Sequence, residues 1–169
     1  MKDDRADPVL SRNLTLDELE GVVWGEPTYD SHLVLTCHRL RRKPIGEFTV
    51  EELRVMIGQK IGLPYLLPLA LEHLEADPFA AGDFFPGDLL KVVLDAEAQW
   101  AAEPELACRM RDLACRALAR LEQIRPVDWV AGEMPDPDEP GECEKEYLED
   151  HLRTALRRLG TAGFKRPPP

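Results

Sequence analysis

The sequence predicts an all-α fold, a compact bundle of about seven helices. Several segments repeat apolar residues at intervals of three and four, the spacing of one helix face, and none alternates polar with apolar residues as a half-buried strand does. Helix-capping residues and Gly/Pro breaks divide these segments. The chain has 169 residues, which suits one core. We expect a helical domain over residues 14–125, preceded by a flexible N-terminus over residues 1–13.

The first helix is predicted from its cap. Thr15 and Glu18 form a T-x-x-E capping box, in which each side chain accepts a hydrogen bond from the other residue's backbone N–H. Gly21 ends this helix. The turn-rich connector VVWGEPTYDS follows, and we expect its aromatic residues Trp24 and Tyr29 to pack into the core.

The second helix begins at Asp30 or Ser31, because either side chain can cap it. Its apolar stripe is predicted to contain Leu33, Cys37 and Leu40. The helix ends in a basic run that suits the negative pole of the helix dipole when exposed, made of Arg39, Arg41, Arg42 and Lys43. Pro44 and Gly46 then break the chain.

The third helix is capped by Thr49 and Glu52 in a second T-x-x-E box. Its stripe is predicted to be Leu53, Ile57 and Ile61, with Val50 and Met56 beside it. Gly62 is expected to end this helix, and Pro64 to occupy the first position of the fourth, where its missing N–H costs nothing. Residues 64–76 are apolar almost all round, so this fourth helix is predicted to be the central buried element.

Residues 79–88 form a predicted tight loop, and Pro86 or Gly87 opens a fifth helix over residues 88–94. A long sixth helix begins near Pro104. Its stripe follows a 4-3-4-4 spacing: Leu106, Met110, Leu113, Ala117 and Leu121. Residues 126–142 are rich in proline and acidic residues and are interpreted as a linker, with Trp129 as a possible contact point. A C-terminal helix over residues 143–160 and a flexible tail over 161–169 complete the chain.

The charge balance restricts the function. The net charge is −11, from 32 acidic and 21 basic residues. Because nucleic-acid-binding surfaces are basic, this excess argues against direct nucleic-acid binding, and it allows a basic partner. No stretch approaches the roughly 18 apolar residues of a membrane span, and the N-terminus MKDDRADPVL lacks a signal-peptide core. We expect a cytoplasmic monomer without a membrane segment.

No catalytic motif is present. HExxH, GxSxG, P-loop and GxGxxG patterns do not occur. Cys37 and His38 are adjacent, and adjacent helical residues do not face each other, so they cannot form a catalytic pair. The acidic cluster over residues 136–144 lacks the spacing of a calcium loop. We therefore predict no catalytic residue, no metal ligand and no cofactor, and we do not expect an enzyme.

Several short motifs occur in an order that resembles a known family. They are LDELEG, WGEP, SHLVLTCHRLRRKP, FTVEELRVMIGQKIGLPYLLPLAL and GDFFPGDLL, over roughly residues 14–100. In this order they resemble contact-dependent growth inhibition (CDI) immunity proteins. The resemblance implies a helical cytoplasmic protein without catalytic residues. Such a protein would bind the C-terminal toxin domain of a large surface protein, often a nuclease, and block its active site.

The candidate toxin-binding surface is acidic. Glu72 and Glu75 lie at the C-terminal end of the fourth helix, where the dipole disfavours acids, so they call for an explanation other than helix stability. Recognition of a basic toxin is one explanation and simple solubility is the other. The candidate site comprises Glu72, Glu75, Asp77, Asp83, Phe84, Phe85 and Asp88. The two phenylalanines could instead pack into the core.

A function of another class stays open. In this alternative the chain is a non-catalytic helical adaptor or regulatory module. The amphipathic sixth and last helices would then bind a partner helix.

Overall fold

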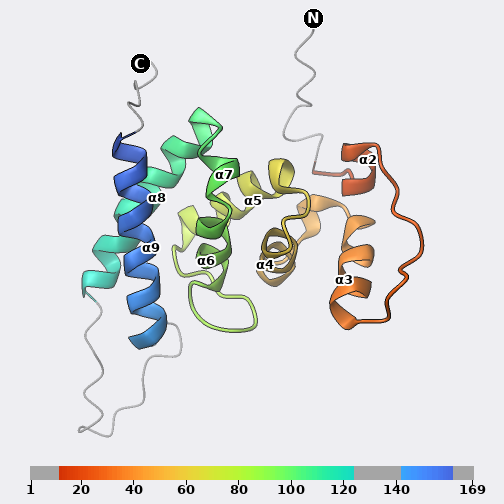
Figure 1. The fold of residues 1–169 in the computed structure, drawn as a ribbon, viewed down its shortest axis with the longest axis horizontal. Coiled ribbons are helices and arrows are strands. Elements are labelled where there is room, and N and C mark those ends of the chain that lie inside the picture. Colours follow the sequence, from red (N-terminus) through yellow and green to blue (C-terminus); the bar gives the residue numbers. More distant parts are fainter. Residues whose placement is uncertain (1–11, 124–141, 162–169) are drawn as a thin grey trace, which may run out of the picture.

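The computed structural model describes residues 12–123 and 142–161, and within them the chain is helical (Figure 1). These ranges contain eight α-helices, one short 3-10 helix and no strand, which confirms the predicted all-α class. One isolated β-bridge joins Thr15 and Pro44. Most of the predicted N-terminal segment, the linker with Trp129 and the tail lie outside the described residues.

The helices follow one another along an elongated molecule. Figure 1 shows α2 and α3 at one end, α8 and α9 at the other, and α4 and α5 between them. The elements are α2 (Leu16–Glu20), α3 (His32–Arg41), η1 (Ile45–Glu47), α4 (Val50–Gly58), α5 (Leu63–Ala76), α6 (Asp88–Asp95), α7 (Glu97–Trp100), α8 (Pro104–Gln123) and α9 (Glu142–Thr161). No helix in the described part of the chain is long and apolar enough to cross a bilayer.

The helix starts predicted from capping residues are confirmed. Thr15 and Thr49 each form a complete capping box, with Glu18 and Glu52 as partners. Ser31, rather than Asp30, caps α3, because its hydroxyl accepts a hydrogen bond from the Val34 backbone N–H at 3.2 Å. Each cap satisfies backbone N–H groups that have no partner inside the helix.

The fourth predicted helix is α5, and it is the central element. It packs against η1, α4, α6, α7 and α8. Four of its leucines are completely buried: Leu66, Leu67, Leu71 and Leu74. Burying a leucine side chain stabilises the fold by about 1.5–3 kcal/mol, so this helix contributes strongly to the core.

The boundary between α4 and α5 differs from the prediction. Gly62 does not end the third predicted helix. That helix, α4, ends earlier at Gly58, and Gly62 is the residue that precedes α5. Pro64 is consequently the second residue of α5 rather than the first. Gly62 has a φ of +65°, and a Cβ there would lie 2.7 Å from a methyl carbon of Leu16, so both the backbone and the packing of α2 require glycine.

The last helix belongs to the same core as the rest. All five residues of the predicted α8 stripe are buried, and α9 packs along α8 and also contacts α6. Leu148 and Leu152 of α9 are completely buried. The apolar faces of α8 and α9 therefore cover each other. Neither face is free for a partner helix, which removes the basis of the adaptor alternative.

Two predictions about the N-terminal part were wrong. Tyr29 is 74% exposed, because the connector passes outside α3, and only Trp24 packs partly against the core. Leu33, in the first turn of α3, is 42% exposed instead of forming part of a buried stripe. The sequence made no prediction about the burial of Arg41, which belongs to the basic run and is buried.

The buried Arg41 holds α2, the connector and α3 together. Its Nε donates to Asp17 Oδ1 at 2.7 Å, and an Nη lies 2.6 Å from Glu20 Oε2. The other Nη donates to the Val22 carbonyl at 3.0 Å. The guanidinium also stacks 4.4 Å from the ring centre of Trp24. These contacts compensate the loss of hydration of a buried cation.

Candidate functional site

The predicted site residues separate into two groups in the structure. Glu72, Glu75 and Asp77 lie at the C-terminal end of α5, and the remaining residues lie in and after the loop that joins α5 to α6. In the first group, Glu75 and Asp77 contact α8 and Glu72 pairs with Arg12, whereas the second group faces α4.

The acids at the end of α5 form ion pairs. Arg109 of α8 donates two hydrogen bonds to Glu75, at 2.7 and 3.0 Å, and these bonds lower the pKa of the Glu75 carboxyl. Arg120 donates to Asp77 at 2.9 Å. Glu72 pairs with Arg12 at 2.6 Å. The unfavourable position of these acids in the helix dipole is therefore explained by ion pairs with cations, chiefly from α8, and not by a free acidic surface.

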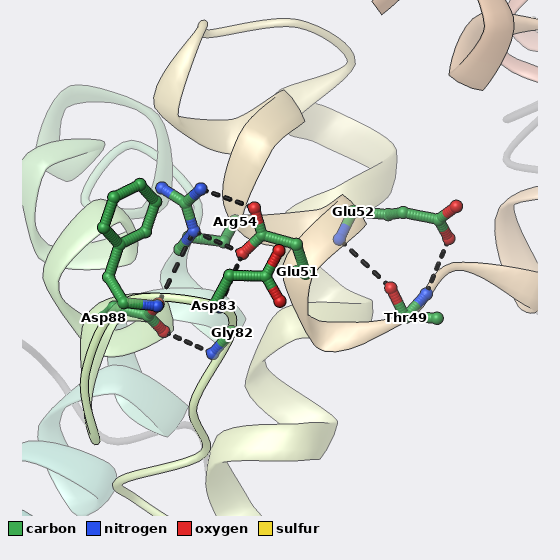
Figure 2. A network of polar contacts seen from close by, with 8 residues as sticks. Thr49, Glu51, Glu52, Arg54, Gly82, Asp83 and Asp88 are labelled. Carbon is green, nitrogen blue, oxygen red and sulfur yellow. Dashed lines mark hydrogen bonds and ion pairs between the residues drawn. The ribbon is translucent and has the colours of Figure 1, made fainter. Parts of the chain in front are cut away.

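The second group is organised by a buried carboxylate. Asp88, the first residue of α6, is only 2% exposed, so it is not the surface acid that the sequence suggested. Its carboxylate turns back onto the preceding loop. It accepts hydrogen bonds from the backbone N–H groups of Gly82 at 2.6 Å and Phe84 at 3.2 Å. Asp88 thus closes residues 82–88 into a compact turn (Figure 2).

Two residues of α4 hold the other side of this loop. Glu51 accepts a hydrogen bond from the Asp83 backbone N–H at 3.0 Å. Arg54 donates twice to Glu51, each time at 2.6 Å, and its Nε lies 3.5 Å from Asp88 Oδ2. Figure 2 shows Arg54 between the two carboxylates. A Cβ at Gly82 would lie 2.3 Å from Glu51 Oε2, so the close approach depends on glycine.

Glu51 and Arg54 each stabilise the charged form of the other. The hydrogen bonds from Arg54 lower the pKa of Glu51, although partial burial opposes the effect, and the Asp83 N–H lowers it further. The same bonds raise the pKa of Arg54. Both groups are therefore charged at neutral pH. Charge-assisted, two-pronged bonds of this kind are stronger than neutral ones, so the loop backbone is held firmly.

The loop presents an aromatic ring and an acid to solvent. Phe84 is 71% exposed, and the Arg54 guanidinium stacks 4.3 Å from its ring centre. Asp83 is exposed and Phe85 is half-buried. Packing of both phenylalanines into the core, the alternative reading of the sequence, is therefore wrong for Phe84. We name residues 82–85 the Phe84 loop. A rigid aromatic residue beside a carboxylate suits protein binding.

Three residues of this network were missed in the sequence. Glu51 and Arg54 are three apart on a helix, which indicates a local ion pair but not their contact with a loop about 30 residues later. Gly82 looked like an ordinary turn glycine. Residue spacing carries no direct signal for contacts between distant segments.

The described residues contain no group of three or more His, Cys, Asp or Glu side chains placed to hold a metal ion. Most of the acidic stretch over residues 136–144 lies outside them. The thiol of Cys37 is buried, which raises its pKa. Cys115 is exposed and Cys108 is half-buried.

The comparisons with known proteins gave one match. A family model described as CDI immunity proteins matches residues 18–110, more than half of the chain. The matched region extends from α2 into α8 and contains Glu51, Arg54 and the whole Phe84 loop. Comparison with curated proteins and with solved structures found no match.

Proposed function

Because the chain belongs to the family of CDI immunity proteins, we propose that it binds the toxin domain of its own CDI system in the cytoplasm and neutralises it by occluding the active site. The family match carries this proposal. In this role the protein needs a specific binding surface and no catalytic group of its own.

We further propose that the Phe84 loop is part of the toxin-binding surface. Interfaces gain most of their affinity from a few buried aromatic or charged residues, surrounded by weaker contacts. Phe84 loses little conformational freedom on binding, because Asp88 and Glu51 already fix the backbone around it. Glu72, Glu75 and Asp77 are less suitable contacts, because binding a toxin through them would compete with their arginine partners.

A nuclease is the toxin class that the charge favours. Nucleases bind phosphates through basic clefts, and this chain carries a net charge of −11. An acidic protein is steered towards such a cleft, and the steering weakens as salt screens the charges. Asp83 beside Phe84 would place a carboxylate at the cleft while the ring packs against its wall.

A titration of the purified chain against the toxin domain encoded beside it tests the proposed surface. Phe84→Ala and Asp83→Lys are compared with wild type, and Asp112→Lys, an exposed charge reversal on α8, serves as the control. We expect a one-to-one complex whose affinity falls by about tenfold or more for each loop variant, as for a central interface residue, and is nearly unchanged for Asp112→Lys. Equal affinities for all four proteins would place the interface elsewhere, and absence of any complex would contradict the immunity function itself.

A further inference from the structure

A second surface with unusual properties lies on α3, away from the Phe84 loop. Leu35, His38, Arg39 and Arg42 are spaced by three, one and three residues, so they share one face of this helix and its end. Glu26 and Pro27 of the connector border an open hollow of about 630 Å³ on this face. We name this surface the α3 face.

The two arginines of the α3 face lack close partners. Arg39 approaches Glu52 only to 3.7 Å, and Glu52 is already bound by Lys43 at 2.7 Å. Arg42 lies 3.7 Å from Glu26, which is itself 89% exposed. Neither guanidinium donates a hydrogen bond to another group in the described parts of the chain.

This lack of partners is unusual for the molecule. The chain has 11 more acidic than basic residues, and other arginines approach a carboxylate within 2.6–2.9 Å, namely Arg12, Arg54, Arg109 and Arg120. The position of Arg39 and Arg42 at the end of α3 suits the helix dipole, but the fold offers their guanidinium donors no close acceptor. Guanidinium groups are well suited to bind carboxylates in a two-pronged geometry.

Exposed apolar side chains are concentrated in the part of the sequence that forms α3 and the connector before it. Six large hydrophobic residues are exposed in the described part of the chain, and five of them fall between residues 22 and 35: Val22, Val23, Tyr29, Leu33 and Leu35. Figure 1 shows the connector that carries three of them looping outside α3. Of these five residues, Leu35 lines the hollow of the α3 face, and Leu33, two residues before it, lies on another side of the helix.

The imidazole of His38 forms part of the wall of this surface. It lines the hollow and contacts the Trp24 ring edge-on, with ring centres 5.1 Å apart. Its Nδ1 is buried and has no hydrogen-bond partner within the described residues. Because that nitrogen is shielded from the hollow, the ring contributes an apolar, aromatic wall to the α3 face rather than a hydrogen-bonding group.

We propose that the α3 face binds an acidic peptide segment of a partner protein, with carboxylates on Arg39 and Arg42 and an apolar side chain in the hollow beside Leu35 and Pro27. Arginine clusters recognise acidic motifs in this way. Leu35 and Pro27 at the hollow favour a protein segment over a nucleic acid, and the overall negative charge disfavours a nucleic acid further. The α3 face is distinct from the Phe84 loop, and binding of an acidic peptide there does not depend on the proposed immunity function.

A differential peptide selection tests this proposal. A random twelve-residue display library is first depleted on the Arg39→Glu, Arg42→Glu double variant and then selected on the wild-type chain. Surviving peptides should be rich in Asp and Glu and carry at least one large apolar residue. In fluorescence anisotropy they should bind wild type at least about tenfold more tightly than the double variant, because the interacting charges are reversed. Leu35→Ser should weaken the same peptides.

The controls separate a local effect from a change of net charge or of folding. Lys60→Glu combined with Ala102→Glu and Ala119→Glu changes the net charge by the same amount at exposed positions elsewhere, and it should bind the peptides like wild type. All variants should keep the helical circular dichroism of the parent and remain folded at the temperature of the binding assay. Selection of no peptides, selection without acidic enrichment, or loss of binding in the control variant would each overturn the proposal. So would a single-stranded oligonucleotide that binds wild type and not the Arg39→Glu, Arg42→Glu variant.

Discussion

At the residue scale, the molecule uses a few side chains to satisfy backbone groups that no helix or sheet can satisfy. Asp88 is the clearest case, because one buried carboxylate accepts two loop N–H groups and lies beside Arg54. Arg41 performs the corresponding task between α2 and α3, where it binds two acids and a carbonyl group. Both side chains are almost completely buried and polar, so neither can be exchanged without leaving a group unsatisfied.

Asp88→Asn should destabilise the protein although it preserves shape. The amide oxygen can accept from the N–H of Gly82, but the amide NH₂ then faces the N–H of Phe84, donor against donor. Leaving a buried donor unsatisfied costs about 1–3 kcal/mol, and urea unfolding measures this loss. Asp95→Asn, on the exposed end of the same helix, removes the charge that pairs with Lys91 but keeps an oxygen that can accept from the Tyr147 hydroxyl, so it should cost less than about 1 kcal/mol. Equal costs for the two variants would show that Asp88 does not hold the loop.

Three glycine-to-alanine substitutions separate backbone strain from steric overlap. Gly25→Ala meets neither obstacle and should be nearly neutral. Gly21→Ala has open space around its Cβ but a φ of +65°, so it should cost about 1 kcal/mol. Gly62→Ala combines the same φ with contact to Leu16 at 2.7 Å and should cost roughly 1–3 kcal/mol more. Thermal unfolding gives the ranking, and a Gly62 variant no less stable than the Gly21 variant would contradict the packing of α2 on α5.

At the element scale, the sequence predicted what is local and missed what is distant. Both capping boxes, the α8 stripe and the buried α5 follow from residues within one or two helical turns of each other. Burial of Arg41 and the attachment of the 82–88 turn to α4 depend on contacts across 20 to 30 residues, which periodicity does not encode. For the same reason the candidate acids were identified as a group, although the structure divides them between α8 and α4.

Ion pairs between elements give the protein an acid-sensitive stability. Hydrogen bonds from Arg54 and Arg109 hold the pKa values of Glu51 and Glu75 below their ordinary value of 4.5. A depressed carboxyl pKa in the folded state stabilises the fold above the unfolded pKa, and that contribution is lost as pH falls through the folded pKa. The urea midpoint should therefore be steady near neutral pH and decline below about pH 4.5. The Glu51→Gln, Glu75→Gln variant should show a shallower decline, and an unchanged slope would assign the acid sensitivity to other groups.

Because α9 is part of the core, shortening one of its buried side chains should destabilise the whole domain. Leu152→Ala removes a completely buried side chain between α9 and its neighbours, and such truncations cost about 2–5 kcal/mol. Because α9 shares a core with α8 and α6, the whole domain should melt in one transition at a lower temperature. Glu146→Ala, exposed on the same helix, is the control and should change little. A separate early transition for α9, with the main melting temperature unchanged, would show that the helix is only an appendage.

At the scale of the whole molecule, the structure combines a rigid helical body with two exposed surfaces of different character. The Phe84 loop joins an aromatic ring to an acid, and the α3 face joins apolar residues to two arginines. Family membership gives the first surface its proposed partner. The net charge of −11 would then govern the rate of association more than the strength of the final complex.

Salt should therefore act mainly on the association rate. In stopped-flow mixing with the toxin domain, the association rate constant of the wild-type chain should fall as ionic strength rises, because screening shortens the range of the charges. Asp83→Lys should associate more slowly and show a weaker salt dependence than Asp112→Lys. A salt dependence that is the same in both variants would move the steering charges away from the Phe84 loop.

Protection of growing cells tests the central claim most directly. The toxin domain encoded beside this chain is expressed from an inducible promoter, with the wild-type chain, with the Phe84→Ala, Asp83→Lys variant, or alone. The account predicts that cells with the toxin alone stop growing, that the wild-type chain restores growth and co-purifies with the toxin in equal amounts, and that the double variant protects less. Growth arrest that persists while the wild-type chain is present, folded and abundant would contradict the claim that this protein neutralises its toxin by binding.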